Sequence, residues 1–287
     1  MNIDFNIDIE GSSKKIDFDD DELRSEFKLT INEVDLSEWV KKFHVKSYLA
    51  ENADIAEIQL TDQTAEISQK IKRGDPVVLS WGWNDENPHT EIFRGVVREN
   101  DKNTDPLTLE CIDYATILNT TIIQHTYENE NAEDILKDII KETGLTPEIE
   151  ISGISIKRMP FFSATAKQAI DFVTEKVNEK SEEVFFYYLR DGKLFWGPRD
   201  REQLPSFGFK TGEDIVAFAK PEKGMSALKS FVSPVLHSQT VLIDEDVYFV
   251  MCAEYIWDDG GRIVLGLLGL NEDWNDDRQI LSDLLPL

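Results

Sequence analysis

Residues 72–83 read KRGDPVVLSWGW, and residues 91–98 read EIFRGVVR. The first stretch opens with the turn residues Gly74-Asp75-Pro76 and continues as a run of apolar and aromatic side chains. Short apolar runs bounded by Gly, Asp and Pro are typical of β-strands. The two stretches therefore predict consecutive strands, and they indicate a β fold for the region around them.

Similar runs lie on both sides of this pair. They occupy residues 43–49, 55–61 and 107–112, and turn residues separate them. Several short strands with such spacing indicate an antiparallel barrel or sandwich. We assign residues 25–118 to a first β-barrel.

The hydrophobic period changes after this region, because apolar residues then recur at the spacing of one helix face. They are Ala132, Ile135, Leu136, Ile139 and Ile140 in one stretch, and Ala166, Ala169, Ile170, Val173 and Val177 in the next. Asn131 and Gly144 fit the two ends of the first helix, and Thr165 or Ser163 fits the start of the second. Asp191-Gly192 lies between two aromatic-rich runs and predicts a hairpin. Residues 119–204 are therefore predicted to form an α+β domain with two helices and a hairpin.

β patterns return after this domain, at residues 215–219, 241–243, 247–257 and 262–270. We assign residues 205–270 to a second β-barrel, and no internal period is visible along the chain. The predicted fold class is mostly β with a smaller α+β part, in which two antiparallel tube-like barrels flank the α+β domain.

Both ends of the chain carry apolar residues that could bind a partner. Residues 1–24 begin with strict apolar–polar alternation and are predicted to be an arm, and residues 271–287 form a tail with an apolar end. The candidate docking residues are Ile3, Phe5, Ile7, Ile9, Ile280, Leu281, Leu284, Leu285 and Leu287. Strand addition to a partner's sheet edge is one use of such segments, and packing on their own subunit is the other.

The net charge of −26 arises from 30 basic and 56 acidic residues. A protein that reads DNA or RNA carries a basic footprint, so direct nucleic-acid recognition is not expected. The N-terminus has neither the basic nor the apolar region of a signal peptide, and the longest apolar runs are too short to span a bilayer. We expect synthesis in the cytoplasm and no stable membrane insertion.

A search for catalytic, cofactor and metal motifs finds none that is complete. Residues 17–21 offer carboxylates at three positions of an EF-hand-like loop, but Glu22 and Lys28 stand where that loop needs Gly and Glu. The histidines have no ligand spacing, and Cys111 and Cys252 lie in apolar runs that favour buried free thiols. Trp81 and Trp83 point to one side of a strand, which favours a core or an interface over a sugar platform.

Several motifs in order resemble those of a known family. Gly74-Asp75-Pro76-Val77 and then Phe93-Arg94-Gly95-Val96-Val97 are similar to the "GD-x-V" and "F-x-G-x-V" strands of phage baseplate hub proteins. This family includes the late control D proteins and the N-terminal hub part of type VI secretion spike proteins. The helix at residues 131–140, the hairpin around Asp191-Gly192 and the hairpin at residues 248–261 also resemble that family, so the resemblance covers about residues 40–270.

The resemblance implies a non-enzymatic structural subunit of a phage tail or contractile injection system. Three copies would form a ring of six similar modules that joins the sixfold tail tube to the threefold central spike. The implied partners are a tail tube protein, a spike protein, and possible contacts with a tape-measure protein and a LysM-type or other baseplate protein. The implied location is the baseplate of the virion or injection particle, with DNA passing through the channel.

The acidic charge has two interpretations in such a ring. Acidic side chains could line the channel and repel passing DNA, or they could keep unassembled subunits soluble. The alternatives to a hub are a tail-associated cell-wall hydrolase and a β module that binds carbohydrates or receptors. A hydrolase would need two carboxylates of divergent pKa in a cleft, and a binding module would use the Trp and Tyr clusters.

Overall fold

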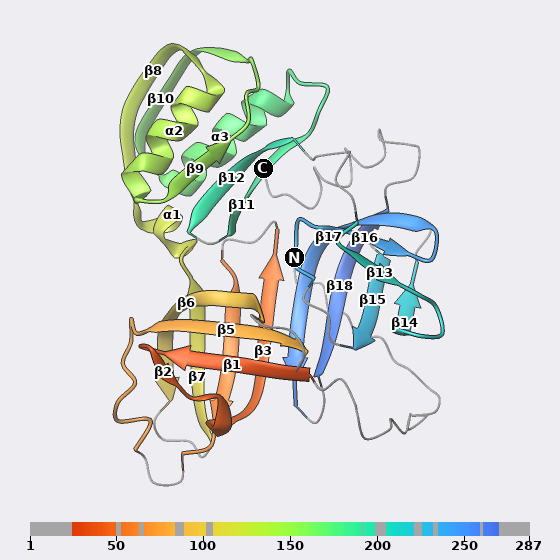
Figure 1. Ribbon diagram of the computed structural model, residues 1–287. Coiled ribbons are helices and arrows are strands. Elements are labelled where there is room, and N and C mark those ends of the chain that lie inside the picture. Colours follow the sequence, from red (N-terminus) through yellow and green to blue (C-terminus); the bar gives the residue numbers. More distant parts are fainter. Residues whose placement is uncertain are drawn as a thin grey trace.

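The computed structural model describes residues 25–49, 53–62, 66–83, 89–101, 106–190, 192–198, 205–220, 226–231, 235–258 and 261–269. Two groups of strands make up most of this structure, and a unit with helices lies between them in the sequence (Figure 1). The mostly β class is therefore confirmed.

The first group of strands, strand set 1, precedes the helical unit. It contains β1 (Ser25–Ile31), β2 (Val34–Asp35), the 3-10 helix η1 (Ser37–Trp39), β3 (Val40–Tyr48), β4 (Ile55–Leu60), β5 (Pro76–Trp83), β6 (Thr90–Asp101) and β7 (Leu107–Asp113). The second group, strand set 2, follows the helical unit. It contains β13 (Phe207–Phe209), β14 (Ile215–Ala219), β15 (Ser226–Phe231), β16 (Thr240–Ile243), β17 (Asp246–Trp257) and β18 (Gly261–Gly269).

Within strand sets 1 and 2, the predicted strand runs coincide with observed strands, but two observed strands, β2 and β15, were not predicted. The longer of the two is β15. Its sequence is SALKSF, and the polar residues Ser226 and Ser230 are buried together with Leu228. Serines on the core side weaken the apolar alternation by which a strand is recognised.

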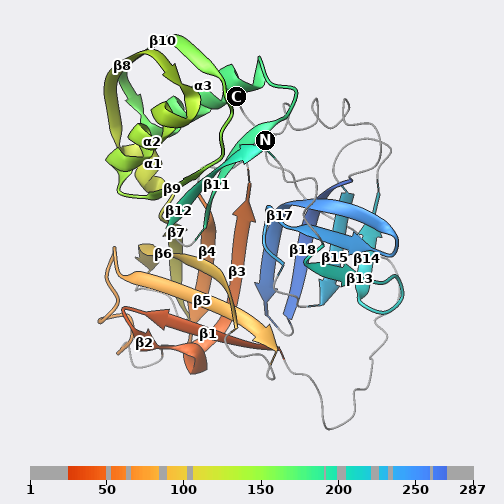
Figure 2. The ribbon, with the colours of Figure 1, turned by 45° about the horizontal axis from the view of Figure 1, so that its top comes forward.

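Both strand sets belong to one 13-stranded sheet. Its order is β14-β15-β18-β17-β3-β4-β7-β6-β5-β1-β2, with β16 paired to β17 and β13 paired to β16. The sets join where β17 pairs antiparallel with β3, and Figure 2 shows these strands side by side. The sequence predicts two barrels that flank the α+β domain, whereas the described strands of both regions lie next to each other in a single sheet.

The two strand sets share one topology. In chain order, β3, β4, β5, β6 and β7 correspond to β14, β15, β16, β17 and β18, and each set pairs its five strands antiparallel in the same spatial order. The outer strands differ in direction, because β1 runs antiparallel to β5 whereas β13 runs parallel to β16. The chain therefore contains a structural repeat.

The repeat extends to local irregularities of the ladders. The register shifts between Val40 and Lys42 in β3 and, at the matched place, between Ile215 and Ala217 in β14. It shifts again next to Val97 in β6 and next to the matched Val250 in β17. Bulges re-aim side chains and bend a strand, so the two sets are bent at matched places.

The α+β unit contains the short helix α1, the two longer helices α2 and α3, a two-stranded ribbon and a three-stranded sheet. Its elements are α1 (Thr116–Thr120), β8 (Ile122–Asn131), α2 (Ala132–Thr143), β9 (Thr146–Ile149), β10 (Ser155–Thr165), α3 (Ala166–Asn178), β11 (Phe185–Arg190) and β12 (Lys193–Pro198). β8 pairs with β10, and β12 pairs with both β11 and β9.

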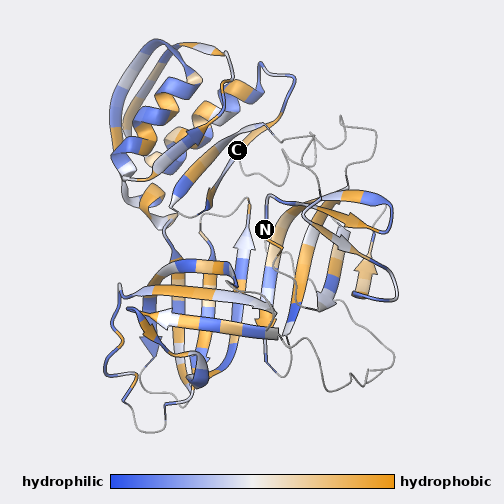
Figure 3. Cartoon of the chain, in the orientation of Figure 1, coloured by the Kyte–Doolittle hydropathy of each residue, from blue (hydrophilic) through white to orange (hydrophobic). Residues whose placement is uncertain are grey.

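The two longer helices begin where the sequence predicts, after Asn131 and Thr165, and α2 also ends where predicted. Gly144 closes α2 in the left-handed conformation with a φ of 79°. Thr165 starts α3 with a capping box, because its side chain accepts the Gln168 N–H while the Gln168 side chain accepts the Thr165 N–H. The predicted apolar stripes of both helices are buried, and Figure 3 shows them as hydrophobic bands on one side of each helix.

The described residues form three buried apolar clusters. The largest runs through both strand sets and includes Phe43, Trp81 and Tyr255, so the two sets share one core. A second cluster lies between α2, α3 and the strands of the α+β unit. A third, small cluster brings Phe186 of the α+β unit against Phe249 of β17, which docks that unit on the sheet.

Candidate functional site

The seam between the two strand sets is the first candidate for an assembly site. Along it, Phe43 to Tyr48 of β3 pair with Trp257 to Cys252 of β17, and the Leu49 N–H donates to the Met251 carbonyl at 2.9 Å. The paired residues are more than 200 positions apart in the chain. The seam shows how an edge of one strand set recognises an edge of the other.

The polar side of the seam is organised around Glu254. Its carboxylate accepts from His44 Nε2 at 2.7 Å and from the Tyr48 hydroxyl at 2.5 Å, and both donors lie on β3. Burial alone would raise the pKa of Glu254, but the hydrogen bonds from His44 and Tyr48 outweigh it and hold this pKa below its ordinary value. The ionised carboxylate of Glu254 therefore links β17 to β3 through two side-chain hydrogen bonds.

The apolar side of the seam is an aromatic cluster. Phe27, Phe43, Trp81, Tyr255 and Trp257 contribute rings whose centroids lie 5.0–6.5 Å apart, mostly edge to face. Such geometry adds about 0.5–1.5 kcal/mol per pair beyond the burial of area. Trp81 is 1 % exposed, so its predicted place in a core is confirmed.

The face of the sheet opposite the core carries mixed charge around the seam. Lys46 lies across from Glu254, and Glu57 lies across from both His44 and Glu110. Arg98 pairs with Glu110 at 2.5 Å. Cations and carboxylates thus lie side by side on this part of the described face.

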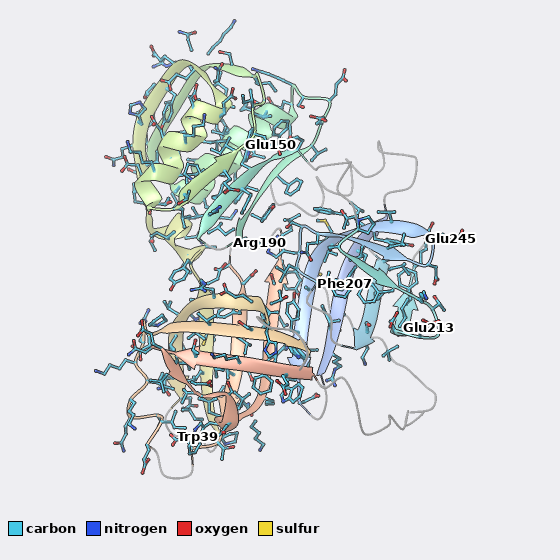
Figure 4. All side chains as sticks on the ribbon, viewed as in Figure 1. Trp39, Glu150, Arg190, Phe207, Glu213 and Glu245 are labelled. Atoms are coloured by element: carbon cyan, nitrogen blue, oxygen red, sulfur yellow. The ribbon has the colours of Figure 1, made fainter. Side chains whose placement is uncertain are left out.

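The α+β unit contacts strand set 2 through the end of its hairpin. Arg190 donates to the His237 carbonyl at 2.6 Å and to the Ser238 hydroxyl at 2.8 Å, and Figure 4 shows it between the unit and the sheet. The Arg190 guanidinium also lies 5.3 Å from the Tyr188 ring centroid. Arg190 therefore fixes the hairpin on the segment that precedes β16.

A cavity of about 220 Å³ lies at this hairpin, and its lining residues include Asp54, Asp113, Arg190 and His237. Burial, and then the nearby charge of Asp54, raise the pKa of Asp113 to about 8. Burial and the neighbouring Arg190 lower the pKa of His237 to about 3, so its ring is neutral at pH 7. The cavity therefore has charged groups of both signs at the junction between the α+β unit and the sheet. The described residues contain no group of three or more His, Cys, Asp and Glu that could hold a metal ion.

The structure describes the two predicted cysteines but not the predicted docking residues or the EF-hand-like carboxylates. Cys111 and Cys252 are buried free thiols, as predicted, and burial followed by the charge of Glu110 raises the pKa of Cys111 to about 12. The nine docking candidates in residues 1–24 and 271–287 lie outside the described residues, as do residues 17–21 with their EF-hand-like carboxylates. Sequence reasoning missed Glu254, His44 and Tyr48 as a group, because no local pattern links β3 to β17.

Within the described residues, no helix has both the length and the apolar character needed to span a membrane.

Known proteins resemble the chain in sequence and in fold. The sequence profile of a family described as YQBQ-like matches residues 44–215, more than half of the chain. No curated protein sequence matches it.

Solved structures share the fold at low sequence identity. A tail protein from Neisseria meningitidis superposes with a TM-score of 0.68 at 11 % identity, over 89 % of this chain and 99 % of its own. The 43 kDa tail protein of prophage MuSo2 from Shewanella oneidensis gives 0.66 at 11 % identity, over 85 % and 98 %. The E. coli c3393 protein gives 0.61 at 10 % identity, over 85 % and 77 %, and is described as a type VI secretion component similar in structure to the bacteriophage T4 tail proteins gp27 and gp5. The chain therefore has the fold of phage tail proteins and of a type VI secretion component.

Proposed function

The chain belongs to the YQBQ-like family, and from this membership and its tail-protein fold we propose that it is a structural baseplate hub subunit. It serves a phage tail or a related contractile injection system and has no catalytic role. Three copies form a ring that joins the sixfold tail tube to the threefold central spike, as in late control D proteins.

The observation that carries this proposal is the repeat of strand topology within one chain. Two similar strand sets in one sheet give each subunit two copies of one module. A ring of three subunits then presents six modules, which suits a sixfold neighbour on one side and a threefold neighbour on the other. In this arrangement residues 25–118 and 205–270 form the ring, and residues 119–204 lie outside it.

The partners follow from the two ends of the ring. A tail tube protein binds one end and a spike protein binds the other, and tape-measure and LysM-type or other baseplate proteins lie nearby. Residues 1–24 and 271–287 act as docking arms. The assembled subunit resides in the tail baseplate of the particle, and DNA passes through the ring without being read.

Electron microscopy of the purified full-length chain, alone and in its native particle, tests the proposal. We expect a threefold ring with a central hole and six modules around it, located between tube and spike. A particle in which labelled protein lies away from the tail axis would contradict the hub role. Zymography on cell-wall material serves as the second measurement, and a clearing zone would favour the hydrolase alternative.

A further inference from the structure

The three-stranded sheet of the α+β unit has one face that does not pack on the helices. Along β11, Phe185 and Tyr187 belong to the cluster between the helices and the strands of the unit. Phe186 and Tyr188 belong instead to the small cluster against β17. Because successive side chains of a strand point to opposite faces, the face away from the helices is the one that carries Phe186 and Tyr188.

A first row of side chains crosses this face from β11 through β12 to β9. Tyr188 lies opposite Phe195, and Phe195 lies opposite Glu148. The rings of Tyr188 and Phe195 are stacked, with centroids 4.9 Å apart and an interplanar angle of 9°. The row therefore leads from two aromatic rings to a carboxylate.

A second row runs beside the first. Phe186 lies opposite Gly197, and the Glu150 N–H donates to the carbonyl of the neighbouring Trp196 at 2.9 Å. A Cβ at Gly197 would lie 3.0–3.1 Å from three side-chain carbons of Glu150, so this side chain lies over the glycine. The missing side chain at Gly197 thus lets Glu150 extend over β12, in the direction of the aromatic residues of β11.

A cavity of about 430 Å³ lies where this face approaches strand set 2. The residues of both rows line it, together with Ser238, which precedes β16, and Phe249 of β17. Phe186 and Phe249 meet edge to face, with ring centroids 5.8 Å apart. The cavity therefore combines aromatic rings from both units with two carboxylates from the end of β9.

The charges at the cavity favour a cationic occupant. Lys193 already pairs with Glu148, and Arg190 donates to the His237 carbonyl and the Ser238 hydroxyl. Glu150 is exposed and has no ion pair within the described part of the chain. A carboxylate next to aromatic ring faces attracts a guanidinium or ammonium group, since both carry negative charge toward it.

The charge of the chain also favours an occupant from outside. Residues 1–24 and 271–287 each contain more acidic than basic residues, so neither end complements the carboxylates. A second copy, with its net charge of −26, fits no better. A basic segment of another protein has the complementary charge.

We propose that this cavity binds a basic, extended segment of a partner protein, whose arginine side chain stacks on Phe195 and pairs with Glu150. Arginine fits better than lysine, because its planar guanidinium can stack on a ring and hold a carboxylate with two N–H groups. Alternate residues of an extended segment lie about 6.6 Å apart on one face, so a second basic residue two positions away reaches Glu148. The site adds a partner to the proposed hub role and does not depend on the ring.

The test measures the binding of a labelled peptide, Arg-Ser-Arg-Ser-Arg with blocked ends, to the full-length chain by fluorescence anisotropy. We expect saturable binding that weakens with added salt and that is lost when glutamine replaces each arginine. Glu150→Gln should weaken binding about fivefold, because it removes the charge that pairs with the guanidinium. Phe195→Leu should weaken it about threefold, because it removes the ring.

Two further variants separate this site from a general attraction to an acidic protein. Glu245→Gln removes an exposed carboxylate from the turn between β16 and β17, away from Glu150 (Figure 4), and should leave binding unchanged. Gly197→Ala keeps every charge but sets a Cβ against the Glu150 side chain, so it should also weaken binding. The melting temperature of Glu150→Gln should equal that of the wild type, since its exposed carboxylate has no ion pair among the described residues.

Other occupants would give different results. Absence of binding, equal binding of the glutamine peptide, or equal effects of Glu150→Gln and Glu245→Gln would overturn the proposal. Binding of an N-acetylglucosamine oligomer that is lost in Phe195→Leu but intact in Glu150→Gln would assign the cavity to a carbohydrate instead. Peptide binding that appears only after deletion of residues 271–287 would assign it to the chain's own end. These results leave the ring untouched, because electron microscopy tests the hub role separately.

Discussion

At one end of the ladder between β6 and β7, strand set 1 pairs Gly95 with Asp113. At the matched end of the ladder between β17 and β18, strand set 2 pairs Tyr248 with Gly269. Each pair contains one glycine, but on opposite strands. A Cβ at Gly95 would lie 2.2 Å from the Ile112 carbonyl oxygen, whereas a Cβ at Gly269 would meet only the Tyr248 ring at 3.6 Å.

The difference shows that the paired strands pack differently at this end of the ladder in the two sets. In set 1 the backbones of β6 and β7 approach so closely that only glycine fits on β6. In set 2 the large Tyr248 ring covers the glycine of the partner strand. This explains the glycine of the "F-x-G-x-V" motif and why no equivalent motif is visible in the second set.

The largest expected effect comes from Gly95→Ala, which should destabilise the chain by about 3 kcal/mol through a clash with backbone that cannot move freely. Urea unfolding of the full-length chain measures this. Gly269→Ala is the matched control and should cost under about 1 kcal/mol. Equal costs at the two positions would contradict the difference between the ladders.

Glu254→Gln should cost about 2 kcal/mol, since it weakens two charge-assisted hydrogen bonds across the seam. Because the pKa of Glu254 is lowered in the folded state, its contribution is present at neutral pH and is lost as the pH falls through that pKa. The variant should therefore lose less stability than wild type on acidification below pH 5. If both proteins lost the same stability on acidification, the ionised Glu254 carboxylate would not stabilise the seam.

Asp113 should make stability fall as the pH rises. Its pKa of about 8 in the folded state lies above the unfolded value, so the folded state binds more protons between about pH 4 and 8. We expect a decrease of about 1.5 kcal/mol over this range, because partial exposure moderates the effect. Asp113→Asn should make the stability less dependent on pH over this range. The position matched to Asp113 in strand set 2 is Gly269, which has no titratable side chain. Thermal melting from pH 5 to 8 measures the slope, and a slope that survives the substitution would assign it elsewhere.

Gly74→Ser should have the smallest effect, about 1 kcal/mol, which reflects the left-handed conformation alone. No atom lies within 4 Å of a Cβ at this position. In strand set 2 the Ser238 N–H donates to the Val250 carbonyl as the Gly74 N–H donates to the matched Val97 carbonyl, and Ser238 also has a positive φ. Denaturant unfolding measures the change. A cost above about 3 kcal/mol would mean that the two turns are not equivalent.

Most strands and both long helices could be predicted from the sequence, because their signals are local. Period-two runs mark the strands, and the stripes with Thr165 and Gly144 mark the helices. β15 was not predicted because two serines face the core and interrupt the apolar alternation. The hydroxyl of one of them, Ser230, donates a hydrogen bond to the Asp214 carbonyl. The partner-docking residues at both ends remain predictions.

The repeat itself could not be read from the sequence. Matched positions seldom keep the residue, and some change between apolar and polar character, as in Ala56 and Ser226 or His44 and Ala219. Bulges and ladders are made by the backbone, so many sequences can form them. Conserved strand order with diverged residues is therefore visible in three dimensions only.

The sequence by itself determined the β-rich class, the helical unit and the acidic charge, since these depend on composition and on contacts near in the chain. Only the tertiary structure decided that the two strand regions form one sheet and that Glu254 bridges β17 and β3. It also decided that the face of the sheet opposite the core carries charges of both signs around the seam. These features join residues about 200 positions apart. Local periodicity fixes which face of a strand is buried, but it does not specify which edges pair, because backbone hydrogen bonds are the same for every sequence.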